Sequence, residues 1–115
     1  MSAWEHFFSA ALLLASVGPI KQRLTTAFTT HLAMLRDDDL PREVREDFTS
    51  LVHSLSRVQP MRGETAVQAT VRKMSDIEAS KHAEQIVTIL GSMARLQSQY
   101  AFARQPLLRA VSSGE

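Results

Sequence analysis

Cysteine is absent from this sequence, and glycine and proline are scarce, with four of each in 115 residues. Without cysteine the chain has no disulfide scaffold, no thiol nucleophile and no cysteine-ligated metal site, and its composition fits a reducing compartment. The glycines and prolines sit between periodic segments or near their ends, where they mark turns. A surplus of either charge is also absent, because 13 Lys and Arg stand against 12 Asp and Glu, giving a net charge of +1. This balance does not require a polyanionic partner.

The longest apolar run, residues 7–17, is too short for a bilayer-spanning helix, which needs about 20 apolar residues. It also departs from a signal peptide, because no Lys or Arg precedes it and no clear small-x-small cleavage site ends it. We therefore expect a cytoplasmic protein without a transmembrane segment.

Helix-capping signals are the most informative feature that is present. The pattern Ser/Thr-x-x-Glu/Gln occurs at Ser2, Thr65 and Ser75. In such a capping box the hydroxyl accepts from the backbone N–H three residues later, and the side chain at that position accepts from the N–H of the capping residue. The sequence therefore predicts that helices begin at these three positions, and a run of about 28 proline-free residues after Ser75 predicts that the last helix is long.

The hydrophobic periodicity extends this prediction to the whole chain. Apolar residues recur at helical spacing, most clearly in residues 44–55, and no alternating run bounded by turn residues indicates a strand. We predict helices over residues 3–17, 19–35, 41–57, 66–73 and 76–102. The expected fold is all-α, an irregular bundle of four main helices plus one short helix, with no sheet. Residues 1–103 should form a single helical domain, and residues 104–115 a frayed tail.

The predicted last helix carries a long inward face and one internal glycine. Gly91 borders that face and costs about 1 kcal/mol relative to alanine in a helix interior, so we expect it to mark a close helix–helix approach. The predicted inward positions are Ala79, Ala83, Ile86, Val87, Leu90, Met93, Ala94 and Gln97.

No pattern of side chains indicates catalysis, a cofactor or a metal. The four histidines include no pair at i, i+3 or i, i+4 spacing, and His31 falls within a predicted apolar face, where a structural role is expected. The run Asp37 to Asp39 lacks the spacing of a calcium loop and is expected to be a solvated cap. Nucleophile and phosphate-loop motifs are missing as well. We therefore predict a non-enzymatic protein without a cofactor.

A basic segment is the first candidate for partner binding. The Lys and Arg residues of this segment, from Arg57 to Lys81, lie within 25 positions around a proline-containing loop. In outline, residues 57–82 resemble a helix-turn-helix. Two acids, Asp76 and Glu78, begin the would-be recognition helix and would face DNA phosphates. Nucleic-acid regulation through this segment is therefore the alternative hypothesis. The candidate contacts are Arg57, Arg62, Arg72 and Lys73.

The first helix is the second candidate, because it has more apolar residues than one face can hold. The predicted inward face of this helix comprises Trp4, Phe7, Phe8, Ala11, Leu14 and Ala15. Leu12 and Leu13 fall outside it, and they mark either a partner seam or the centre of a small bundle. The leading hypothesis is a protein–protein interaction module, and a homodimer is one form of it.

Overall fold

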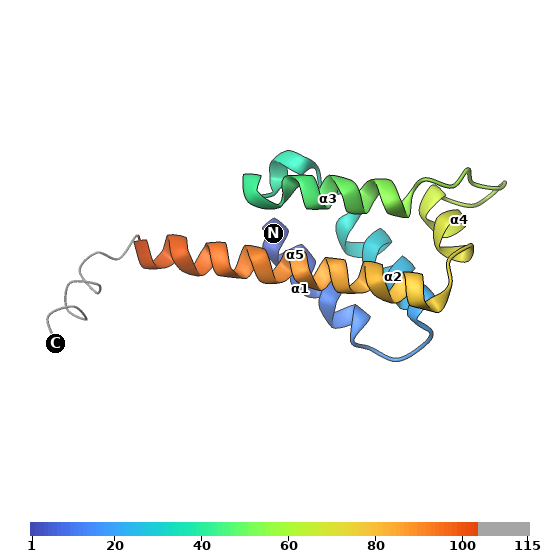
Figure 1. Cartoon of the computed structure of the whole chain (residues 1–115), viewed down its shortest axis with the longest axis horizontal. Coiled ribbons are helices and arrows are strands. Elements are labelled where there is room, and N and C mark those ends of the chain that lie inside the picture. Colours follow the sequence, from blue (N-terminus) through green and yellow to red (C-terminus); the bar gives the residue numbers. More distant parts are fainter. Residues whose placement is uncertain (104–115) are drawn as a thin grey trace, which may run out of the picture.

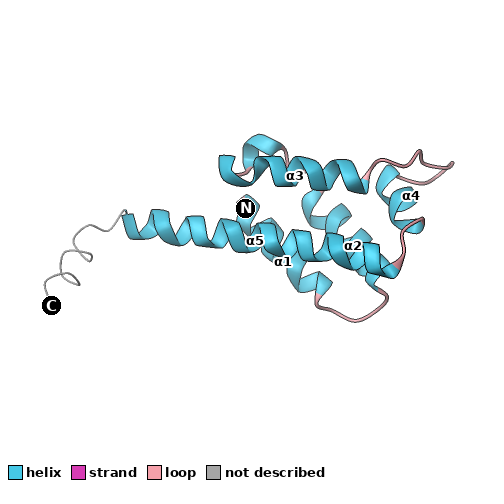
Figure 2. Cartoon of the chain, in the orientation of Figure 1, coloured by secondary structure: helices cyan, strands magenta, loops and turns pink. Residues whose placement is uncertain are grey.

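The computed structural model describes residues 1–103, with side chains described through residue 99, and over this range helices joined by loops are its only regular secondary structure (Figure 2). The prediction of an irregular all-α bundle without a sheet is confirmed for the described residues. The tail predicted at residues 104–115 lies outside them. The helices are α1 (Ala3–Leu14), α2 (Ile20–Ala27), α3 (Arg42–Leu55), α4 (Ala66–Arg72) and α5 (Asp76–Ala103).

The long helix α5 organises the bundle, because α1, α2 and α3 all pack against it, while short α4 contacts α2 and α3 (Figure 1). Helix α1 runs in the opposite sense to α5. Ala3 and Met93 line one hollow between these helices, and Ala11 and Ala83 line another. The C-terminal part of α5 extends beyond the other helices (Figure 1).

The core joins all five helices through aliphatic and aromatic side chains. Phe7 of α1 meets Phe48 of α3 edge to face, with ring centroids 5.9 Å apart and an interplanar angle of 68°. This is a favoured geometry for aromatic pairs. The largest side chains with almost no exposure are Phe7, Leu24, Leu32, Leu40, Leu51, Leu55, Ile86, Ile89 and Met93.

All three predicted capping boxes are present. The hydroxyl oxygen accepts from the third backbone N–H at 3.3 Å for Ser2, 3.1 Å for Thr65 and 3.1 Å for Ser75. The return bonds form too, and the one from the Ser2 backbone N–H lowers the pKa of Glu5. Local sequence signals thus fix where α1, α4 and α5 begin.

Helix α1 ends at Leu14, three residues before the predicted end. Arg23 of α2 stabilises this end, because its guanidinium donates to the carbonyl of Leu14 and, at 2.7 Å from Nε, to that of Gly18 in the following turn. A cation at a helix C-terminus satisfies carbonyls that have no partner within the helix. Gly18 then turns the chain with a φ of +109°, a conformation that residues with a Cβ rarely adopt.

The predicted continuous helix over residues 19–35 is wrong in its second half. Helix α2 ends at Ala27 and a π-helical turn follows at Phe28–Leu32, closed by the Ala33 N–H donating to the Phe28 carbonyl at 2.9 Å. This wider turn contains one residue more than an α-helical turn, so the side chains that follow it point in different directions from those of a continuous α-helix. Leu32 is buried, whereas His31, expected in the apolar face, is partly buried.

The inward face of α5 differs from the predicted one. Ile89, which was not predicted to face inward, is 2% exposed, whereas Val87 is 49% exposed and both Ala94 and Gln97 lie on the surface. The prediction assumed that one straight stripe of α5 is buried. Because three helices cover α5, the buried part of its surface instead includes Ile89 and excludes Val87. The predicted close approach at Gly91 is also wrong. Among the described residues, a Cβ there would meet only the Arg95 side chain of the same helix, at 3.8 Å.

Candidate interaction surface

The two leucines singled out by the sequence, Leu12 and Leu13, lie on different sides of α1. Successive helical residues are about 100° apart around the axis, so adjacent side chains cannot share a face. Leu13 is partly buried and packs against the core, whereas Leu12 is 60% exposed. The structure therefore leaves only Leu12 available to a partner.

Leu12 does not stand alone on its side of the helix. Phe8 precedes it by one turn and is 45% exposed, and Ala15, one turn later, is also exposed. The Phe8 ring stacks on Trp4, with centroids 5.5 Å apart and an interplanar angle of 13°. This stack restricts the Phe8 side chain, so less conformational entropy is lost when a partner covers it.

A groove of about 510 Å³ lies beside these residues, between α1 and α5. Both walls carry small side chains, with Ala11 and Ala15 on α1 and Ala83 on α5. Val87 forms part of the α5 wall and is 49% exposed. We call this surface the α1–α5 face; it comprises Phe8, Leu12, the groove residues Ala11, Leu14, Ala15, Ala83 and Val87, and the polar edge residues Glu84 and Thr88.

Charge is nearly absent from the α1–α5 face. Residues 7–20 contain no Asp, Glu, Lys, Arg or His. Glu84 is the one ionisable residue that lines the groove, and it is exposed. An exposed apolar surface without fixed charges is typical of a site that another protein covers.

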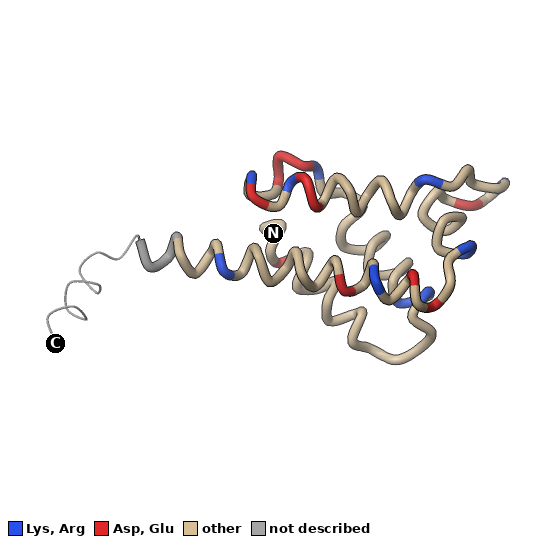
Figure 3. The backbone as a smooth tube through the Cα atoms, in the orientation of Figure 1, with Lys and Arg blue, Asp and Glu red and all other residues tan. Residues whose placement is uncertain are grey.

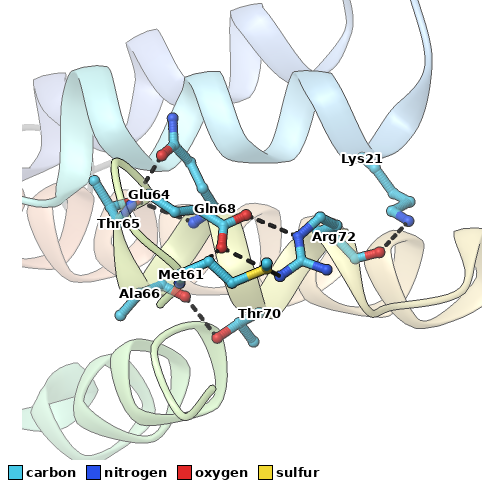
Figure 4. A network of polar contacts seen from close by, with 8 residues as sticks. All are labelled: Lys21, Met61, Glu64, Thr65, Ala66, Gln68, Thr70 and Arg72. Atoms are coloured by element: carbon cyan, nitrogen blue, oxygen red, sulfur yellow. Dashed lines mark hydrogen bonds and ion pairs between the residues drawn. The ribbon is translucent and has the colours of Figure 1, made fainter. Parts of the chain in front are cut away.

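The basic segment has a different character, because its central arginine is already paired. Arg72 donates to both carboxylate oxygens of Glu64, at 2.8 Å from Nε and 3.2 Å from Nη2 (Figure 4). The Arg72 contact and a backbone N–H from Met61 lower the pKa of Glu64, and the same ion pair raises the pKa of Arg72. Both side chains keep solvent contact, at 45% exposure for Arg72 and 18% for Glu64.

The Arg72–Glu64 pair belongs to a network that holds the loop between α3 and α4 (Figure 4). The Glu64 N–H donates to the Met61 carbonyl at 3.0 Å, closing a turn in which Gly63 has a φ of +80°. Lys21 of α2 donates to the Arg72 carbonyl at 2.9 Å. Arg72 therefore serves the structure of this loop.

The buried hydroxyl of Thr70 ties the same loop to α4. It donates to the Ala66 carbonyl at 2.7 Å and accepts from the Val58 backbone N–H at 3.0 Å. Thr70 is 1% exposed, so an unpaired hydroxyl there would be costly. Together with the Arg72–Glu64 pair, this contact gives the loop a defined shape.

The other predicted basic contacts, Arg57, Arg62 and Lys73, are exposed. Figure 3 shows Asp and Glu interspersed with Lys and Arg at the end of the molecule where α4 and the start of α5 lie. Asp76 and Glu78 are exposed in the first turn of α5. Mixed charge of this kind gives a phosphate backbone less attraction than a continuous basic surface does.

A second hollow, of about 340 Å³, lies where the start of α1 meets α5 and the turn before α3. Trp4, Leu40 and Met93 supply its apolar lining, and Asp39 also lines it, with its carboxylate accepting from the Arg36 backbone N–H at 2.8 Å. The Trp4 indole N–H has no hydrogen-bond partner among the described residues. Within residues 1–103, no three His, Asp or Glu side chains are grouped as metal ligands would be.

Comparison with known proteins finds no match to a family model, a curated protein or a solved structure. None of the described helices combines the length and the apolar composition that crossing a membrane requires.

Three features of this surface were missed by the sequence patterns. Phe8 and Val87 were predicted to face inward, because each lies on the edge of an apolar stripe whose centre the sequence does not define. The groove was not predicted either, since Ala11 and Ala83 are 72 positions apart and only the fold places them together. The available signal was the excess of apolar residues on α1.

Proposed function

We propose that this protein is a non-enzymatic interaction module that binds another protein through the α1–α5 face. The observation that carries the proposal is the 60% exposure of Leu12 beside a groove almost free of charge. Burial of apolar surface contributes about 25 cal/mol per Å², so covering Leu12 and Phe8 favours association by about 3–4 kcal/mol before association costs are subtracted.

The shape of the groove favours a helical partner. Helices pack by placing ridges of side chains from one helix into grooves of another. Here the groove lies between two helices and has small residues on both walls, so a ridge of larger apolar side chains fits between them. We therefore expect the partner to present an apolar stripe at i, i+3 or i+4, and i+7 spacing. We expect the binding to take place in the cytoplasm, in keeping with the lack of cysteine.

The nucleic-acid hypothesis receives less support. It requires Arg57, Arg62, Arg72 and Lys73 to act as phosphate contacts, but Arg72 is engaged by Glu64 and by the loop network. A phosphate at Arg72 would have to displace the carboxylate of Glu64. The exposed acids at the start of α5 oppose binding to the same strand.

A site-specific photo-crosslinker tests where partners bind. Benzoylphenylalanine would replace Leu12 in one variant and Met61 in another, because these side chains are similarly exposed, at 60% and 65%. We expect protein adducts in native lysate from position 12, and we expect Val87→Glu in the same chain to remove them. Equal adducts from both positions, or protein adducts at position 61 alone, would contradict the proposed face.

A further inference from the structure

We infer that the partner of the α1–α5 face is a second copy of this chain, related to the first by a two-fold axis. This inference rests on the proposed function and names the partner that the face selects. The reasons are the shape, the charge and the size of the surface.

The first reason is shape, because a protruding side chain, Leu12, and a groove lie side by side on one face. Leu12 projects into solvent, and Ala15, one turn later on the same helix, forms part of the groove wall with Ala83 of α5. In a two-fold interface, residue i of one copy contacts residue j of the other, and the reverse contact forms as well. In the inferred dimer each Leu12 therefore enters the groove of the other copy, so both leucines are buried and both grooves are filled.

The second reason is charge, because a two-fold interface brings like charges near each other and this face has few of them. A surface with a fixed net charge repels its own copy, and like charges opposite one another cost binding energy. Residues 7–20 carry no charged side chain, so the part of α1 that holds Phe8 and Leu12 meets its copy without such a cost, and Glu5 in the first turn is exposed outside that stretch. Glu84 is exposed at the edge of the groove and stays hydrated at the rim of the interface.

The size reason sets the expected strength. Helix α1 has 12 residues. A face about 18 Å long and two helix diameters wide buries on the order of 1,000 Å² from the two copies together. This lies near the low end for specific interfaces, where weak and reversible complexes are found. The expected dimer therefore has a dissociation constant in the micromolar range, and monomer and dimer exchange rapidly.

Sedimentation equilibrium over about 10 to about 500 µM tests self-association. We compare the wild type with Leu12→Glu and with Met34→Glu, a matched control because Met34 is 54% exposed and lies outside the face. We expect the wild type and the control to dimerise alike, and Leu12→Glu to weaken dimerisation by about tenfold or more. Circular dichroism confirms that each variant is folded. A wild type that stays monomeric at the highest concentration, or a Leu12→Glu variant that dimerises like the wild type, would overturn the inference.

A charge-complementation experiment tests the two-fold geometry itself. In the inferred dimer Leu12 of one copy reaches the groove wall at Val87 of the other. Leu12→Glu and Val87→Lys should each dimerise about tenfold or more weakly than the wild type when alone, since each buries an unpaired charge in both halves of the interface. An equimolar mixture should dimerise, because one half pairs Glu with Lys and the other half keeps Leu12 on Val87. A mixture that associates no more than its components would contradict this arrangement.

The two proposals fail in different ways. If the wild type is monomeric while position 12 still crosslinks to a different protein, the second copy is excluded and the interaction module stands. If the wild type dimerises and Leu12→Glu leaves the dimer intact, self-association uses another surface, and the inference is wrong.

Discussion

Leu12 and Leu13 are adjacent in the sequence, yet they lie on different sides of α1. Leu13 packs against the core, and Leu12 is 60% exposed beside the groove that separates α1 from α5. The two leucines therefore have different roles: Leu13 contributes to the stability of the bundle, and Leu12 contributes to the proposed partner surface.

Alanine substitutions should separate these two roles. Leu13→Ala is expected to reduce the free energy of unfolding by about 1–3 kcal/mol, since a partly buried leucine loses apolar contacts. Leu12→Ala should change it by less than about 0.5 kcal/mol, as is usual at exposed positions. Urea denaturation at low protein concentration, where the chain is monomeric, gives both values. An equal loss for the two variants would mean that Leu12 is part of the core.

Much of the fold follows from local signals in the sequence. The hydroxyl caps at Ser2, Thr65 and Ser75 fix three helix starts, because each contact spans only three residues. The stripe of α3 is equally local: Val44 and Phe48 are buried on the face that the spacing predicts. Short-range chemistry of this kind is visible in the sequence itself.

The remaining features depend on contacts between distant residues. The end of α1 is stabilised by Arg23 from the next helix, and the buried face of α5 is set by the three helices that cover it. The pairing of Arg72 with Glu64 requires the turn at Gly63. Within the candidate site, the sequence predicted an excess of apolar surface on α1 but not that Val87 of α5 would lie beside it.

The Glu64–Arg72 pair predicts a pH dependence. The folded pKa of Glu64 lies below its ordinary value of 4.5, so its contribution to stability is fully present above that value. The contribution is lost as the pH falls through the folded pKa. An NMR titration of the Glu64 carboxyl carbon should show the lowered pKa in the wild type and a pKa closer to the ordinary value in Arg72→Gln.

Arg62→Gln is the control for this titration, because Arg62 lies in the same turn while Arg72 supplies the largest cause of the shift. The pKa of Glu64 should stay low in that variant. A Glu64 pKa that does not rise in Arg72→Gln would show that the ion pair is not formed in solution.

The capping box of α5 predicts a loss of stability in Ser75→Ala. The Ser75 hydroxyl accepts from the Glu78 backbone N–H at 3.1 Å, and its removal leaves that donor to water. The expected cost is about 1 kcal/mol in the free energy of unfolding. Ser80→Ala, at an exposed position inside α5, should cost nothing or stabilise slightly. Equal unfolding midpoints for Ser75→Ala and Ser80→Ala would contradict the cap.

Two glycines should respond to alanine in opposite directions. Gly91 lies inside α5, and an added Cβ meets only the Arg95 side chain at 3.8 Å. Gly91→Ala should therefore stabilise the protein by about 0.5–1 kcal/mol. Gly63 has a φ of +80°, so Gly63→Ala should destabilise by about 1–2 kcal/mol. Thermal melts measure both changes, and a loss of stability in Gly91→Ala would reveal a close contact at that position.

The position of the self-association surface is tested most directly by a dilution series of amide NMR spectra of the ¹⁵N-labelled wild type. If the α1–α5 face binds a second copy, amide shifts between about 10 and about 500 µM should change with concentration at residues 8–17 and 83–88. Residues 57–73 should stay constant and serve as the internal control. Changes centred on residues 57–73, or spectra that do not change with concentration, would contradict a dimer formed through Leu12 and the α1–α5 groove.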